Sequence, residues 1–124
     1  MPQNLITAKE PEKVVLVGIV TSEQKDTDEY LKELAFLTET AGGVPVKHFS
    51  QRMETPNPTS YVGTGKLNEI REYVKENDID IVIFDDDLSP SQLRNIERSL
   101  ECKILDRTNL ILDIFAKQIG RAHV

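Results

Sequence analysis

A chain of 124 residues with 39% hydrophobic side chains is long enough for one globular domain with its own core. Its 21 acidic and 15 basic side chains give a net charge of −6, which weighs against a protein that holds nucleic acid by charge alone. A single cysteine, Cys102, excludes an intrachain disulfide, and the absence of a membrane-length apolar run or a signal-peptide layout predicts a cytoplasmic protein.

The first part of the chain predicts an arm, a buried strand and an amphipathic helix. Residues 1–12 show no hydrophobic periodicity, so we expect a flexible N-terminal arm. Lys13–Val20 is an unbroken apolar run, which is typical of a strand buried on both faces of a parallel sheet. The helix that follows ends at Gly42 and Gly43, a strong stop signal. Its apolar stripe consists of Leu31, Leu34, Ala35, Thr38 and Ala41.

A second strand and a second helix flank an irregular, proline-containing connection. Val44–Met53 predicts a strand, and Pro45 near its start fits a strand end or a sheet edge. Pro56 and Pro58 then bar helical structure at the residues before them. A helix is predicted from about Thr64 to Asn77, with an apolar stripe of Leu67, Ile70 and Val74.

The remaining elements are two strands and two helices. Asp78–Asp87 predicts a third strand that is apolar up to Phe84 and then acidic. Ser89 as N-cap and Pro90 at the first helical position predict a helix start, with Leu93, Ile96 and Leu100 facing the core. Residues 102–106 predict a short fourth strand. Residues 107–118 predict a helix whose apolar face consists of Leu110, Ile111, Ile114 and Phe115.

This alternation of strands and helices predicts the fold class. We expect an α/β domain with a small parallel four-stranded sheet, strand order 2-1-3-4, and helices on both faces. Ligand crevices are then expected at the C-terminal ends of the strands.

The turn Gly63-Thr64-Gly65-Lys66 poses the first functional question. A phosphate-binding P-loop needs Gly, four residues, then Gly-Lys-Ser/Thr, but Leu67 follows the lysine and no glycine stands at the position of the first glycine, which is Ser60 here. What remains is a helix N-terminus with a nearby lysine, which could receive an anion or an RNA phosphate. The alternative is structural, in which the glycines supply backbone angles that other residues avoid.

The acidic run Asp85-Asp86-Asp87 poses a second functional question. Three carboxylates at a strand end can hold Mg²⁺, as in receiver-like domains, but the acidic pair that a receiver carries after its first strand is replaced here by Thr21, Ser22 and Glu23. The alternative is that one aspartate caps the following helix while the others are solvated. His48 and His123 have no partner at metal-ligand spacing.

Three motifs in a fixed order make the chain resemble a known family. They are YVGTGK, from Tyr61 to Lys66, then FDDDLSPSQLRN, from Phe84 to Asn95, then DRTNLILDIF, from Asp106 to Phe115. Together they look like the N-terminal domain of the HflX family of ribosome-associated GTPases, over about residues 13–117. Asp87 departs from the motif, since the family often has Glu at that position.

The resemblance implies a function and a set of site residues. HflX-type proteins bind the large ribosomal subunit, hydrolyse GTP with Mg²⁺, and help split or rescue stalled ribosomes under stress, while their N-terminal domain does not hold the P-loop. The expected contact with rRNA or another anion comprises Tyr61, Gly63, Thr64, Gly65 and Lys66. The expected motif surface comprises Asp85, Asp86, Asp87, Ser89, Arg94, Asp106 and Arg107. The alternative is a small nucleotide- or Mg-binding, receiver-like α/β domain.

The resemblance also divides the chain. We expect the HflX-like α/β domain over residues 13–106 and, over residues 107–118, the start of a helix that leads to a missing helical hairpin. The codons ATC GGA AGA GCA CAC GTC would encode residues 119–124 and match a common sequencing adapter, so we expect a non-native tail. The chain would then be a fragment whose partners include its own missing helical and GTPase domains. If it depends on them, the exposed final helix should drive self-association.

Overall fold

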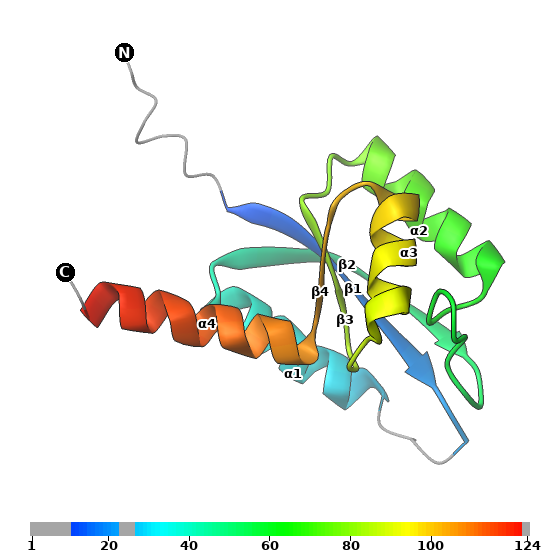
Figure 1. Ribbon diagram of the computed structural model, residues 1–124, viewed down its shortest axis with the longest axis horizontal. Helices are drawn as coiled ribbons and strands as arrows, with labels where there is room; N and C mark the ends of the chain where they lie inside the picture. The colour runs from blue at the N-terminus through cyan, green and yellow to red at the C-terminus, as the bar shows by residue number, and fades with distance from the viewer. Residues whose placement is uncertain (1–10, 23–26, 123–124) are drawn as a thin grey trace.

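The structure, a computed structural model, describes residues 11–22 and 27–122. Most of the predicted arm over residues 1–12, and His123, lie outside these described residues. Strands and helices alternate along the chain (Figure 1). Their bounds are β1 Glu12–Val20, α1 Thr27–Thr40, β2 Gly43–Arg52, α2 Thr64–Glu76, β3 Ile81–Phe84, α3 Pro90–Leu100, β4 Lys103–Asp106 and α4 Arg107–Ala122.

The four strands form one parallel sheet in the order β2-β1-β3-β4, which confirms the predicted fold class and strand order. β1 pairs with β2 on one side and with β3 on the other, so its apolar run is central. The pairing of β1 with β2 shifts between Val14 and Val15, where Val14 lies opposite Pro45 and Val15 opposite Lys47. The proline therefore sits beside a β-bulge near the start of an outer strand, a position where its missing N–H is tolerated.

Helices cover both faces of the sheet, as predicted (Figure 1). α2 and α3 pack on one face, and α1 and α4 pack on the other. Alternate residues of β1 supply the two cores, because successive side chains of a strand point to opposite faces. Val15 and Val17 lie in the core under α2 and α3, while Val14 and Leu16 lie in the core under α1 and α4.

β3 is shorter than the strand predicted over residues 78–87. Asp78 adopts a left-handed conformation with φ 49°, and the Ile79 amide donates to the Val74 carbonyl oxygen at 3.1 Å, so both still belong to the turn after α2. Asp80 bonds to Lys13 of β1 through its amide, which donates to the Lys13 carbonyl oxygen at 3.0 Å, and through its carboxylate, which accepts from the Lys13 amide at 2.8 Å. The paired strand ends at Phe84, which leaves the acidic run free to bond elsewhere.

α4 runs to Ala122, past the predicted end of the helix at residue 118. Leu110 is fully buried against the sheet, as predicted for its apolar face. Ile111 and Phe115, however, are 47% and 61% exposed, so that face is only partly buried. Among the described residues, no helix is both long and apolar enough to cross a bilayer.

The predicted start of α3 is confirmed and yields a first test. Ser89 Oγ accepts a hydrogen bond from the Gln92 amide, and the Gln92 side chain accepts one from the Ser89 amide, which together make a capping box. Ser89→Ala should lower the free energy of unfolding by about 1 kcal/mol, since one first-turn amide loses its partner. Urea unfolding measures this loss, and the exposed Ser91→Ala serves as the control that should change stability much less.

Candidate functional site

The three sequence motifs meet at the C-terminal edge of the sheet. The loop before α2, the segment between β3 and α3, and the junction between β4 and α4 all lie there. Parallel strands bring their C-terminal ends to one edge, which explains why motifs far apart in sequence become neighbours.

Tyr61 ties the loop before α2 to the sheet. Its ring is 2% exposed and meets Phe84 edge-on at a centroid distance of 5.4 Å. Its hydroxyl donates a hydrogen bond to the Asp86 carboxylate. Burial, followed by the negative charges of Asp86 and Asp85, raises the pKa of the Tyr61 hydroxyl well above its usual value. The group therefore stays protonated and acts as a hydrogen-bond donor.

The N-terminus of α2 is the part of this motif that faces outward. Gly63 is the N-cap without a side-chain cap, and its amide donates to Gln51 Oε1 at 2.8 Å. Thr64 and Gly65 are exposed, and α2 has no acidic residue in its first turn. Lys66 Nζ lies 3.3 Å from Glu69 one turn on. The end of the helix therefore presents its positive dipole and first-turn amides outward.

The structural role expected for the glycines is wrong. Gly63 has φ −67° and ψ 161°, which any residue adopts, and the left-handed conformation belongs to Tyr61 with φ 67°. A Cβ at Gly63 would lie 3.2 Å from the Gln51 side-chain nitrogen, so a close approach explains this glycine. A Cβ at Gly65 would meet nothing within 4 Å.

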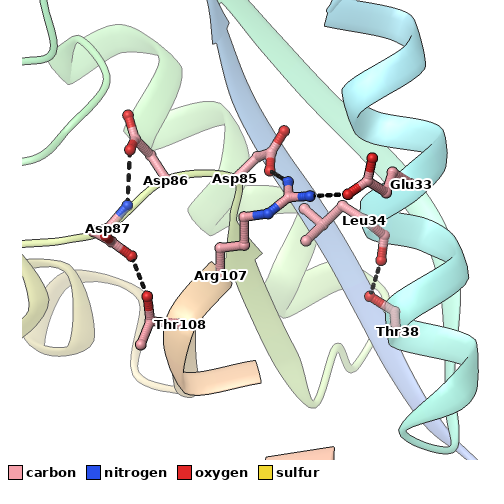
Figure 2. A network of polar contacts seen from close by, with 8 residues as sticks. All are labelled: Glu33, Leu34, Thr38, Asp85, Asp86, Asp87, Arg107 and Thr108. Atoms are coloured by element: carbon pink, nitrogen blue, oxygen red, sulfur yellow. Dashed lines mark hydrogen bonds and ion pairs between the residues drawn. The ribbon is translucent and has the colours of Figure 1, made fainter. Parts of the chain in front are cut away.

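Asp85 forms a buried ion pair rather than an open carboxylate. Its side chain is 6% exposed, and Asp85 Oδ1 accepts a hydrogen bond from Arg107 Nη1 at 2.5 Å (Figure 2). The other terminal nitrogen of Arg107 bonds to Glu33 on α1. Burial raises the pKa of Asp85, while the adjacent guanidinium opposes that rise. Arg107 thus joins the segment after β3 to α1 and to the start of α4.

The neighbouring carboxylates hold the start of α4. Asp87 Oδ1 accepts from Thr108 Oγ1 at 2.5 Å, and Asp86 Oδ1 accepts from the Asp87 amide at 2.9 Å (Figure 2). Asp106 accepts from the Asn109 amide at 2.8 Å and from the Leu88 amide at 3.0 Å. The expectation that an aspartate of the acidic run caps α3 is therefore wrong, because Ser89 caps α3.

α3 completes the network by donating two hydrogen bonds to the loop before α2. Gln92, only 8% exposed, donates from Nε2 to the Asn57 carbonyl oxygen at 2.8 Å. Asn95 donates to the Thr59 carbonyl oxygen at 3.2 Å. Asn57 Oδ1 in turn accepts from the Thr59 amide, closing a tight turn. The roles of Asn57 and Gln92 were not predicted, although the Ser-x-x-Gln spacing from Ser89 is a capping signal in the sequence.

Other predicted residues lie away from this network. Arg94 is exposed on α3, and His48 is exposed on β2. Cys102 is half-buried. Its burial, with a smaller contribution from the charge of Asp80, raises the pKa of the thiol to about 11. The thiol is therefore protonated and unreactive at neutral pH. Within the described ranges, no three His, Cys, Asp or Glu side chains converge as metal ligands. The geometry gives no support to a receiver-like magnesium site.

Comparison with known proteins places these motifs in a family. A family model described as "GTP-binding GTPase N-terminal" matches residues 28–116. GTPase HflX of Flavobacterium psychrophilum is 59% identical over 109 residues, covering 86% of this chain and 26% of the relative. GTPase HflX of Escherichia coli K12 is 43% identical over 112 residues, covering 90% of this chain and 26% of the relative. The chain belongs to the HflX GTPase family.

Within that family, the chain corresponds to the N-terminal domain and spans about a quarter of the length of the curated HflX relatives it matches. A solved GTP-binding protein from Sulfolobus solfataricus, in complex with GDP, has the same fold with a TM-score of 0.60 and 25% identity. The match covers 85% of this chain and 30% of that protein. A variant of SsGBP gives a TM-score of 0.68 at 25% identity, covering 85% of this chain and 32% of that one.

The geometry separates the HflX motif residues into two groups. Tyr61, Asp85, Asp106 and Arg107 are buried or half-buried and bond to other parts of the domain. Thr64, Gly65 and Arg94 are exposed, as expected of residues available to a partner. The first group positions α2, α3 and α4; the second is the candidate interface.

Proposed function

We propose that this chain is the ribosome-binding N-terminal domain of an HflX-type GTPase. It would associate in the cytoplasm with the large ribosomal subunit and contribute to splitting or rescuing stalled ribosomes. Hydrolysis of GTP with Mg²⁺ would belong to parts of the full-length protein outside this chain. In this proposal residues 13–106 are the binding domain, residues 107–118 begin the connection to a helical hairpin, and residues 119–124 are a non-native tail.

The observation that carries the proposal is the outward-facing end of α2 in a chain that belongs to this family. Thr64 and Gly65 are exposed there, and Lys66 is the only nearby cation among residues 60–70. A helix N-terminus with free amides suits a phosphate oxygen, and the open space at Gly65 lets a phosphate group approach the backbone. The rest of the motif is engaged inside the domain, so we assign the rRNA contact to residues 63–66.

Binding should therefore depend on Lys66 and on salt. Lys66→Ala should weaken cosedimentation with large ribosomal subunits roughly threefold to tenfold and lower the slope of log affinity against log salt by about 1, as loss of one phosphate contact predicts. Lys103→Ala, which removes a lysine from the far edge of the sheet, is the matched control and should leave binding unchanged. A folded wild-type chain that does not cosediment at low salt would defeat the proposal.

A further inference from the structure

β2 forms an outer edge of the sheet with an unusual charge. In the strand order β2-β1-β3-β4, no described strand pairs with its outer side. Such an edge presents the N–H and C=O groups of every second residue to solvent. β2 carries Lys47, His48 and Arg52 and no acidic residue, although the chain as a whole has a net charge of −6. The edge is therefore a local basic strip on an acidic protein.

A groove runs beside this edge on the α1 face of the sheet. Its volume is about 480 Å³, within the range of sites that enclose a ligand. Its walls are mainly apolar and come from β1, α1 and β2: Leu16, Leu31, Ala35, Pro45 and Val46. Asp28 and Lys32 from α1 and His48 from β2 add polar groups to the lining; Lys47 also borders the groove, but its ammonium group lies over Phe49 on the other face of the strand. Val46 is 42% exposed, so the apolar wall is incompletely covered.

We infer that β2 and this groove bind an extended acidic peptide, which adds to the sheet as a fifth strand beside β2. Backbone hydrogen bonds along the edge would give affinity, and alternate side chains of the peptide would enter the groove. Acidic side chains would lie near the basic residues of β2, which supplies the charge complementarity.

The geometry limits where this pairing can occur. Pro45 has no N–H, and the bulge opposite Val14 and Val15 interrupts the regular strand there, so the first residues of β2 are protected from pairing. The segment Lys47–Arg52 contains neither a proline nor a bulge, so it can pair. Lys47 lies over the rings of Phe49 and Tyr73, at 5.5 Å and 5.9 Å from the centroids, so it stands on the α2 face of the strand. His48, which lines the groove, stands on the α1 face.

A second copy of this chain fits the same edge less well. Two β2 strands related by a two-fold axis would run antiparallel, and a pair centred on Lys47 or on His48 would place that residue opposite its own copy. Basic side chains directly opposite each other destabilise a strand pair. An acidic partner avoids this repulsion, so the charge pattern selects against self-pairing.

The test uses the isotope-labelled chain and an eight-residue peptide of alternating valine and glutamate. We expect saturable amide shifts in Lys47–Arg52 and in the groove residues of α1, with slowed hydrogen exchange at every second residue of β2. Two N-methylated versions of the peptide, each blocking one alternate set of amides, should differ: one should lose binding and the other keep it, since only one set faces β2.

Charge variants complete the test. With the valines in the groove, the glutamates lie on the α2 face beside Lys47, so Lys47→Glu should weaken binding of the glutamate peptide by about fivefold or more, and Lys103→Glu on the opposite edge strand should not. Equal binding of a valine–lysine peptide would overturn the inference. Tighter binding of single-stranded RNA at the same residues would also overturn it, as would concentration-dependent shifts in β2 without any peptide.

Discussion

Arg107→Met is expected to lower the free energy of unfolding by about 2–4 kcal/mol at neutral pH, since removing one partner of a buried ion pair leaves the other uncompensated. Asp85, with its side chain 6% exposed, would keep its burial and lose its counter-charge. Glu33 is 57% exposed and would be solvated, so the loss of its ion pair with Arg107 should contribute little to the fall in stability. Urea unfolding followed by circular dichroism measures the difference.

The pH dependence of this variant identifies the cause. Burial already raises the pKa of Asp85, and removing Arg107 removes the main influence that lowers it. A carboxyl whose pKa is higher in the folded state costs stability as the pH rises above the pKa of the unfolded chain, about 3.9. The difference in free energy of unfolding between the wild type and Arg107→Met should thus be smaller at about pH 4 and largest near pH 7. An equal difference at both pH values would assign the loss to the packing of the arginine stem.

A double variant serves as the control. Asp85→Leu combined with Arg107→Met removes both charges and keeps apolar volume at the site. It should recover much of the lost stability, because replacing a whole buried pair by apolar groups is often nearly neutral. A double variant as unstable as Arg107→Met alone would show that Arg107 contributes mainly through Glu33 or through the start of α4.

Tyr61→Ala is expected to cost about 3–5 kcal/mol of stability, the range for removing a large aromatic side chain from a packed core. The ring is buried against Phe84, and its loss would also release the loop before α2. Tyr61→Phe keeps the ring and should cost only about 1 kcal/mol, through the lost hydrogen bond to Asp86. Thermal and urea unfolding measure both.

The backbone at this position supplies a sharper comparison. Tyr61 has φ 67°, a conformation that glycine adopts without strain. Tyr61→Gly should therefore be more stable than Tyr61→Ala by about 0.5–1 kcal/mol, the reverse of the usual order for these two residues. If alanine proves the more stable, the loop has relaxed out of the left-handed conformation in the variants.

Sequence periodicity predicted the architecture because it depends on local burial. The apolar run of β1 and the stripe of Leu67, Ile70 and Val74 on α2 both follow from which faces are covered, and both were predicted correctly. Alternation of strands and helices then restricted the order of the sheet, since crossovers between parallel strands follow few routes. The length of β3 was wrong because the apolar Ile79 is buried in a turn rather than in the sheet.

The pairings inside the motifs could not be read from the sequence. Glu33 and Arg107 are 74 residues apart, and Asp87 and Thr108 are 21 apart, so no local spacing links them. The sequence of three aspartates is the same whether they bind a cation or accept hydrogen bonds from the start of a helix, so the sequence alone does not distinguish the two roles. Only the strand order, which brings β3 beside β4, places the acidic run next to Arg107. The left-handed conformation of Tyr61 could not be predicted either, because Gly63 and Gly65 were the residues expected to adopt unusual backbone angles.

The attachment of α4 has a mechanical consequence. Asp106, Arg107 and Thr108 bond to the segment between β3 and α3, and Arg107 also bonds to α1, so the base of the helix is fixed at the C-terminal edge of the sheet. The 16 residues of α4 extend about 24 Å at 1.5 Å per residue. A rotation of about 10° at that base would move the far end by roughly 4 Å on that length. A small change in the bonding of Arg107 would therefore displace residues far along α4 more than those at its base.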